Sequence, residues 1–469
     1  MLVPGLALSQ QKAVDAMLSD PCMKSGSAAI LIMDINNSEI IAEHNSSVSL
    51  TQASVMKLIT SAAALELLGS EHRFVTGIGF TGSVRKSSGT LEGDIIIKGG
   101  GDPVLGSENF PDYYEDFADS WVTEISSAGI KRIKGRIVSD DSYFDYQPVP
   151  PGWNWEDLGN YYGAGVYGIS LYDNTLKMHF RTSGTGTVPV LLYTEPKDPG
   201  INLRNYLRAS GNSDQGYVYM SPYSSSGWIS GTIPVNSDDF VLKASLPDPP
   251  LLLSKILTGK LKAAGIKVKL EPVTVRLITG YSPASYTEIA RTESPPLSEI
   301  IKLLNTESIN LYAEHLVKEI GKLTSDEGTT DAGLSAVRQF LESIGLETGG
   351  MFIEDGSGLS PQDAVNPAQM VKLLVYMKEK SRNWHEYFDS LPEAGKEGTL
   401  KDCFLDPVFD GRLRAKSGTL TRSKAYAGYF ETMTGREMTF CIIVNNFTGP
   451  STHIVEHIED ILKETISYK

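Results

Sequence analysis

The sequence has little of what marks several large classes of protein. Its 469 residues include only three cysteines, an odd number that gives neither a disulfide framework nor a zinc-binding spacing. No apolar run approaches the roughly 20 residues that a membrane-spanning helix needs. Basic residues number 42 against 57 acidic ones, and this excess of acids argues against binding to nucleic-acid phosphates. We therefore expect a soluble protein with an acidic surface. Cys441 lies in the apolar run MTFCIIVNN, where a buried free thiol is expected.

The order of helical and strand-like patterns predicts two or three compact units, since domains usually hold about 100–200 residues. Near the N-terminus, two apolar segments around Asn36-Asn37 predict a β-hairpin, and a helix follows up to Gly69. Short β-rich segments fill residues 76–275 and enclose one amphipathic helix. Helices, three strand-like runs and a closing amphipathic helix follow from about Leu297. We predict a discontinuous domain, residues 1–77 and 286–469, and an inserted β-rich region, residues 78–285, of two small subdomains.

A serine and a lysine, Ser54 and Lys57, lie three residues apart where the first helix begins. A serine hydroxyl is a poor nucleophile until a base takes its proton, and a neutral lysine on the same helical face can do so. The pattern alone is weak, because a serine at a helix start is usually a cap.

Two further groups of polar residues supply what such a nucleophile needs. Ser308 and Asn310 in NTESINLYAEH would point the same way in an extended loop, one to relay a proton and one to hold a substrate amide. A helix cap explains them equally well. Lys416-Ser417-Gly418-Thr419 offers a cation and hydroxyls for a carboxylate, and its glycine allows close backbone approach. A solvated strand lysine is the alternative.

In this order, Ser-x-x-Lys, Ser-x-Asn and Lys-Ser-Gly resemble the signature of penicillin-binding proteins and serine β-lactamases. The chain is similar to the class C, low-molecular-mass D-alanyl-D-alanine carboxypeptidase/endopeptidases, which carry a long insertion between the first two motifs. The likeness covers nearly the whole chain. It includes GGGDPVL, DDSYFD, GWNWEDL, DGSGLS and SLPEAGKEGTL. It implies an α+β fold, in which a transpeptidase domain with an antiparallel sheet flanked by helices carries a large β-rich insertion.

The resemblance implies acyl transfer at a D-alanyl-D-alanine bond of peptidoglycan, without a cofactor. Ser54 is the expected nucleophile, and Lys57 is its base, with a pKa lowered by burial, by Lys416 and by the helix N-terminus. Ser308 would pass the proton to the leaving amine, and Asn310 would orient Lys57 and the substrate amide.

The substrate-binding residues are also assigned by the resemblance. Backbone N–H groups of Ser54 and Thr419 would form the oxyanion hole, and Lys416, Ser417 and Thr419 would bind the terminal carboxylate. Asp157 and Tyr162 match positions that face the amino end of a diaminopimelate side chain. 

The sequence departs from the pattern of these relatives in three places. Ser417 stands where threonine is commoner, which keeps the hydroxyl. Pro361 and Thr421 stand where relatives carry arginine and glutamine. Because those positions help to recognise the substrate side chain, the resemblance does not specify which side chain this protein prefers.

Two other patterns in the sequence are typical of metal or phosphate sites. His453, Glu456 and His457 fit the inverted zinc-protease pattern His-x-x-Glu-His, but little chain follows to supply a third ligand, and we expect no metal. The run at residues 99–101 lacks the Gly-Lys-Ser/Thr ending of a phosphate-binding loop and predicts a tight turn.

We expect a penicillin-binding serine DD-carboxypeptidase or DD-endopeptidase whose partners are peptidoglycan stem peptides and β-lactams. A serine β-lactamase and a non-catalytic penicillin-binding sensor remain alternatives, and an oligomer is allowed. Family membership implies an extracytoplasmic location. Because MLVPGLALS is short and uncharged, the signal peptide is expected to be absent from this sequence.

Overall fold

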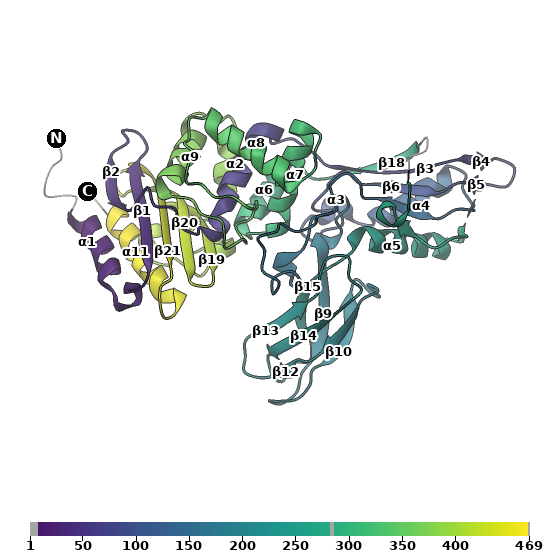
Figure 1. Cartoon of the computed structure of the whole chain (residues 1–469), viewed down its shortest axis with the longest axis horizontal. Helices are drawn as coiled ribbons and strands as arrows, with labels where there is room; N and C mark the ends of the chain where they lie inside the picture. Colours follow the sequence, from purple (N-terminus) through teal and green to yellow (C-terminus); the bar gives the residue numbers. More distant parts are fainter. Residues whose placement is uncertain (1–7, 282–285, 468–469) are drawn as a thin grey trace.

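An antiparallel sheet joins the two ends of the chain into one domain. The computed structural model describes residues 8–281 and 286–467. In it, the strand order β19-β20-β21-β1-β2 places the N-terminal hairpin beside the C-terminal meander (Figure 1). The strands are β1 (Ser27–Asp34), β2 (Ile40–His44), β19 (Leu413–Leu420), β20 (Ser423–Glu431) and β21 (Glu437–Asn445).

Helices cover both faces of this sheet, because successive strand residues point to opposite sides. In β20, Ala425, Ala427 and Tyr429 belong to one core, whereas Tyr426 and Phe430 belong to the other. The first core includes residues of α2 (Lys57–Leu68), α6 (Leu297–Thr306), α7 (Asn310–Ser325), α8 (Thr330–Ser343), α9 (Pro367–Glu379) and α10 (Trp384–Asp389). The second core is closed by α1 (Leu8–Ser19) and α11 (Ser451–Ile466).

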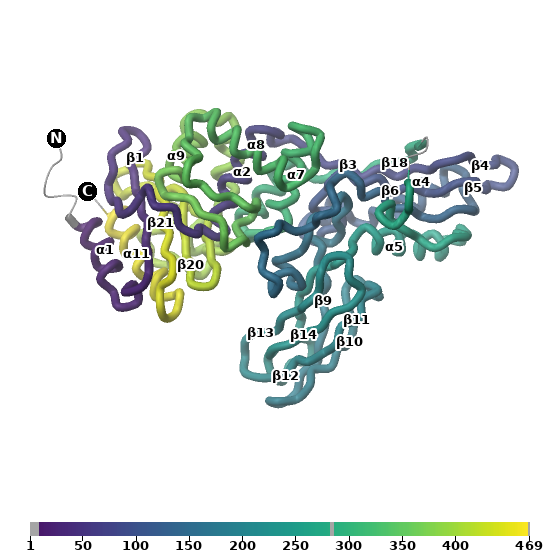
Figure 2. The backbone as a smooth tube through the Cα atoms, viewed as in Figure 1, coloured from purple at the N-terminus to yellow at the C-terminus, as the bar shows by residue number. Residues whose placement is uncertain are grey.

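The long middle of the chain forms two lobes beside this domain (Figure 2). One lobe holds sheets of order β17-β8-β6-β3-β18 and β16-β7-β5-β4, and the other holds β10-β9-β15 and β11-β14-β12 with β13 beside β14. The first lobe comprises β3 (Val75–Phe80), β4 (Ser83–Arg85), β5 (Thr90–Glu92), β6 (Ile95–Lys98), α3 (Pro111–Tyr114), α4 (Phe117–Ser127), β7 (Arg132–Ile133), β8 (Ile137–Asp140), α5 (Pro249–Ala263), β16 (Lys267–Val268), β17 (Val273–Thr274) and β18 (Thr287–Glu293). The second comprises β9 (Thr175–Arg181), β10 (Val190–Glu195), β11 (Asn202–Asn205), β12 (Arg208–Ala209), β13 (Gln215–Tyr219), β14 (Ser226–Ile233) and β15 (Phe240–Ser245).

The chain enters and leaves the inserted region through paired strands. β3 pairs antiparallel with β18, and Val75 lies opposite Glu293. We therefore propose that the inserted region runs from about residue 75 to residue 293, slightly beyond the division at 78–285 that the sequence suggested.

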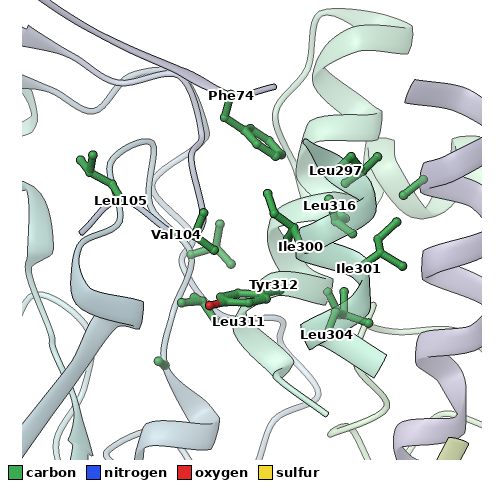
Figure 3. Close-up of a cluster of buried hydrophobic side chains, with 14 of the residues drawn as sticks. Phe74, Val104, Leu105, Leu297, Ile300, Ile301, Leu304, Leu311, Tyr312 and Leu316 are labelled. Atoms are coloured by element: carbon green, nitrogen blue, oxygen red, sulfur yellow. The ribbon is translucent and has the colours of Figure 1, made fainter. Parts of the chain in front are cut away.

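Apolar side chains fasten the inserted region to the helical face of the domain. Val104 and Leu105 of the insertion lie beside Ile300, Leu311 and Tyr312 of α6 and α7 (Figure 3). These five residues are almost fully buried. The contact fixes the insertion next to the N-terminus of α7, where the Ser-x-Asn motif lies.

The structure confirms most of the predicted elements and corrects two. The N-terminal hairpin is present, but the residue with left-handed backbone is Ser38, at φ 58°, rather than Asn36 or Asn37. The helical stretch after Leu297 is broken into α6 and α7. Helices α1, α3, α4 and α10 were not predicted from the sequence.

The structure bears on two expectations from composition, which concern the cysteines and membrane-spanning helices. Cys22, Cys403 and Cys441 are free thiols, and Cys441 is buried as expected. Within residues 8–281 and 286–467, no helix is both long and apolar enough to cross a bilayer.

Candidate active site

The amine of Lys57 is the centre of the candidate site. It lies 3.0 Å from Ser54 Oγ, donates to Asn310 Oδ1 at 2.6 Å and donates to the carbonyl of Ser357 at 2.8 Å. The side chain is fully buried. One nitrogen therefore connects the first two sequence motifs and a third segment, DGSGLS.

A short 3-10 turn, Ala53–Met56, places Ser54 just before α2, which starts at Lys57. The preceding residue, Ala53, has an unusual left-handed backbone at φ 49°. Two side chains hold the approach to this turn. Asn445 accepts from Thr51 N and donates to Thr51 O, both at 2.9 Å, and Ser423 donates to the same carbonyl. The nucleophile candidate is thus anchored to the ends of β20 and β21.

Strand β19 passes very close to the Ser54 turn at Gly418. A Cβ atom at Gly418 would lie 2.4 Å from the carbonyl oxygen of Gln52 and 3.1 Å from the nitrogen of Ser54. Any side chain would therefore push the strand away from the turn. The glycine of the Lys-Ser-Gly motif therefore serves backbone packing beside Ser54.

The remaining residues of the third motif have different surroundings. Lys416 is buried and donates to the carbonyl of Ser417 at 2.9 Å, which excludes the solvated-lysine alternative. The hydroxyl of Ser417 bonds to that of Thr399 at 2.8 Å. Thr419 is exposed to the cavity described below, and its hydroxyl accepts from Lys424.

Ser308 and Asn310 both reach the site, but not from the extended loop that was expected. Ser308 has a left-handed backbone, at φ 60°, in the break between α6 and α7, and Asn310 is the first residue of α7. The N-cap position belongs to Ile309, which has no polar side chain to cap the helix. The capping alternative is therefore wrong. Asn310 also donates to the carbonyl of Tyr162 at 2.8 Å, which joins the insertion to the site.

Burial sets the protonation of the two lysines. Loss of hydration lowers the pKa of Lys57 to about 7, although Asp355, Glu314 and Asp363 oppose this. Burial also holds the pKa of Lys416 well below its usual range, and repulsion from Lys57 adds to the effect. From the sequence, burial, Lys416 and the helix N-terminus were all expected to lower the pKa of Lys57. In the structure burial causes the lowering, and neither of the other two is among the causes.

The DGSGLS segment is a loop folded around one buried carboxylate. Asp355 accepts from the backbone nitrogens of Ser357, Gly358 and Ser360 at 3.0, 2.6 and 2.7 Å. Its Oδ2 also accepts from the indole nitrogen of Trp153, at 2.8 Å. Since Ser357 holds Lys57 through its carbonyl, a tryptophan of the inserted region supports the loop that positions the candidate base.

A cavity of about 890 Å³ opens over Ser54 and is walled on one side by the insertion. Asp157 and Tyr162 line it, as do Ser308, Asn310 and Thr419. Burial raises the pKa of Asp157, while a hydrogen bond from Tyr162 opposes the rise. Sequence reasoning missed several wall residues because no local motif marks them: Glu108, Asn109, Asp173, Lys177, Glu195, Lys243 and Glu307.

The other residues singled out from the sequence lie as follows. Glycines 99 and 100 pack against the carbonyl oxygens of Gly168 and Val75, where no Cβ would fit, and Gly101 has φ +74°. The tight turn expected at these residues is not formed, because Gly99 and Gly101 donate instead to the distant carbonyls of Asp140 and Gly168. Among the described residues that line the cavity, neither Pro361 nor Thr421 is found, although Leu420 is.

The contact between Trp153 and Asp355 predicts a specific loss of stability. Trp153→Phe keeps the ring but removes the N–H donated to a buried carboxylate, so the free energy of unfolding should fall by roughly 1.5–3 kcal/mol. Urea denaturation followed by fluorescence measures this. Trp155→Phe is the matched control, because Trp155 lies two residues away and is 49% exposed. Equal effects of the two substitutions would contradict the role of the hydrogen bond.

Comparison with known proteins identifies a family for nearly the whole chain. A family model described as the D-Ala-D-Ala carboxypeptidase 3 (S13) family matches residues 10–464. A D-alanyl-D-alanine carboxypeptidase of Actinomadura sp. (strain R39) is 28% identical over 94% of this chain and 82% of that protein. D-alanyl-D-alanine carboxypeptidase DacB of Haemophilus influenzae is 22% identical over 92% of this chain and 88% of its own length.

Solved structures show the same fold. The crystal structure of penicillin binding protein 4 (dacB) from Haemophilus influenzae superposes with a TM-score of 0.83 at 22% identity, covering 97% of this chain and 99% of that chain. This likeness confirms the α+β fold expected from the sequence. Together with the family match, it confirms the resemblance drawn from the motifs. The chain belongs to the D-Ala-D-Ala carboxypeptidase 3 (S13) family and is a serine-type D-alanyl-D-alanine carboxypeptidase.

Proposed function

We propose that this enzyme cleaves D-alanyl-D-alanine bonds of peptidoglycan stem peptides through an acyl-enzyme on Ser54, and that β-lactams acylate the same serine. The observation that carries the proposal is the 3.0 Å contact between Ser54 Oγ and the buried amine of Lys57 at the floor of the cavity. Because burial lowers the pKa of Lys57 to about 7, a substantial share of this amine is neutral at neutral pH and able to act as a base.

The residues around Ser54 suggest the order of proton transfers. Lys57 takes the hydroxyl proton while Ser54 Oγ forms a bond to the carbonyl carbon. The resulting oxyanion is held by the backbone N–H groups of Ser54 and Thr419, each donor being worth roughly 2.7–4 kcal/mol in comparable sites. Ser308, on the cavity wall, passes the proton to the departing D-alanine amine. Water then releases the acyl group from Ser54, with Lys57 again the base.

The carboxylate of the departing residue binds at the third motif. Lys416 directly precedes Ser417 in β19 and donates to its carbonyl. Burial favours a neutral Lys416 in the empty site, but an entering carboxylate favours its charged form, because an opposite charge stabilises the ammonium. The site therefore gains its positive charge with the substrate.

The inserted region supplies the wall that meets the substrate side chain. Asp157 lines the cavity next to Tyr162, and a carboxylate in this half-buried position suits an ammonium such as that of diaminopimelate.

Two related structures agree with binding of β-lactams and with action on cross-linked peptides. Penicillin binding protein 4 (dacB) from Haemophilus influenzae has been solved in complex with a novel β-lactam, and it superposes with a TM-score of 0.77. Bd3459, a predatory peptidoglycan endopeptidase from Bdellovibrio bacteriovorus, superposes with a TM-score of 0.53. Since peptidoglycan lies outside the cytoplasmic membrane, we propose an extracytoplasmic location.

Removal of the nucleophile should abolish both activities. Ser54→Ala leaves no oxygen to be acylated, so fluorescent penicillin should give no covalent adduct, and a pentapeptide ending in D-Ala-D-Ala should release no D-alanine. Intact-mass spectrometry measures the adduct. Ser49→Ala is the control, because this half-buried serine donates to a loop carbonyl, Gly350 O. Persistent labelling of Ser54→Ala would disprove the assignment. Rapid turnover of a chromogenic cephalosporin by the parent enzyme would instead favour the β-lactamase alternative.

The pKa of Lys57 predicts the dependence of acylation on pH. The base must be neutral, so kcat/KM should rise roughly tenfold per pH unit below the pKa and level off above it. With a pKa of about 7 for Lys57, the plateau should begin near neutral pH. Stopped-flow acylation by penicillin between pH 5 and pH 9 measures the profile, with circular dichroism to verify folding. A flat profile over this range would rule out Lys57 as the titrating base.

A change at Asp157 should alter selectivity more than chemistry. Asp157→Asn removes one charge, so kcat/KM for peptides with a free side-chain amine should fall roughly 10- to 100-fold, as for loss of a hydrogen bond to a charged group. Peptides whose side-chain amine is acetylated should be cleaved at an unchanged rate, and so should penicillin acylation. Equal losses for both peptides would contradict contact between Asp157 and the amine.

A further inference from the structure

Two histidines and an aspartate meet on the side of the sheet away from Ser54. His453 and His457 lie one turn apart on α11, and Asp20 precedes the 3-10 turn after α1. Figure 1 shows α1 and α11 side by side at the end of the molecule where both termini lie. Their core is separate from the one that contains α2.

The ligand atoms of these residues converge on one point. Nε2 of His453 lies 3.1 Å and Nε2 of His457 lies 3.3 Å from the same oxygen, Asp20 Oδ2. All three atoms fall within 4.8 Å of one another. In a tetrahedral zinc site with bonds of about 2.0–2.2 Å, neighbouring ligand atoms are about 3.3–3.6 Å apart. The observed spacing is therefore close to that of one face of such a site.

Further contacts orient the ligands. Asp20 Oδ1 accepts from the backbone nitrogen of Cys22 at 2.8 Å, which turns the other oxygen towards the histidines. Nδ1 of His453 faces Glu456 Oε2 at 3.4 Å. A carboxylate on the second nitrogen of a metal-bound histidine fixes the ring and increases its basicity. In the motif His-x-x-Glu-His, the two histidines are therefore candidate ligands, and Glu456 contacts the second ring nitrogen of His453.

We propose that Asp20, His453 and His457 bind one divalent transition-metal ion, Zn²⁺, which ties the N-terminal segment to the C-terminal helix. Two imidazoles and one carboxylate suit Zn²⁺, whereas Ca²⁺ and Mg²⁺ prefer oxygen ligands only. No metal was expected from the sequence, although His453, Glu456 and His457 fit a zinc-binding pattern, because the third ligand, Asp20, lies 433 residues before His453. A role in peptide cleavage is excluded by its position across the sheet from Ser54. The ion acts as a structural clamp.

Calorimetric titration of ZnCl₂ into the chelator-treated full chain tests the proposal. One ion per chain should bind with micromolar or tighter affinity, and saturation should raise the Tm. His457→Gln should weaken binding at least tenfold, and the double variant with His453→Gln should abolish it. Glu456→Gln should weaken it roughly 10-fold, as is usual for a contact behind a metal ligand. His385→Gln is the matched control, since His385 is an exposed histidine on another helix.

Two additional measurements verify the folding of each variant and the geometry of the metal site. Labelling by fluorescent penicillin verifies folding of each variant, because none of these residues contacts the cavity. Co²⁺ in place of Zn²⁺ should give the visible absorption of a tetrahedral site in the parent and in His385→Gln, and none in the double variant. The proposal is overturned if no saturable binding occurs below the millimolar range, or if the double variant binds as tightly as the parent.

Discussion

The buried amine of Lys57 is the contact on which the rest of the site depends. It joins Ser54, Asn310 and the carbonyl of Ser357, and these come from three distant parts of the chain. Burial lowers the pKa of this lysine, because desolvation disfavours the charged ammonium form. The same burial that costs stability therefore produces a base next to a serine. The amine nitrogen of Lys57 thus affects both the stability of the fold and the proposed reaction.

The inserted region contributes to this arrangement as well as forming a wall of the cavity. Trp153 donates to the carboxylate of Asp355, and the carbonyl of Tyr162 accepts from Asn310. Asn310 accepts directly from Lys57, and Asp355 holds the backbone of Ser357, whose carbonyl accepts from Lys57. The shared hydrophobic core around Tyr312 holds the two parts together. Movement of the insertion would therefore change both the shape of the cavity and the surroundings of the candidate base.

Local patterns in the sequence predict what local physics determines. Helical periodicity and caps located α9 and α11, and alternation located the meander of β19 to β21. The motif residues were found because their chemistry is readable from type and spacing. The left-handed backbone of Ser308, the partner of Ser417 and the ring of residues around the cavity were not predicted, since each depends on tertiary contacts. Asp20 beside His453 is the extreme case, because no pattern links residues so far apart.

The central claim is that Lys57 loses its proton near pH 7, far below the usual range of a lysine, and it can be measured directly. Enzyme with ¹³C at the lysine ε-carbon reports the titration of each amine by NMR, and Lys57→Arg identifies the signal of Lys57. The account predicts a midpoint at a pH of about 7 for this residue. A Lys57 signal that stays in the protonated position up to pH 9 would contradict it.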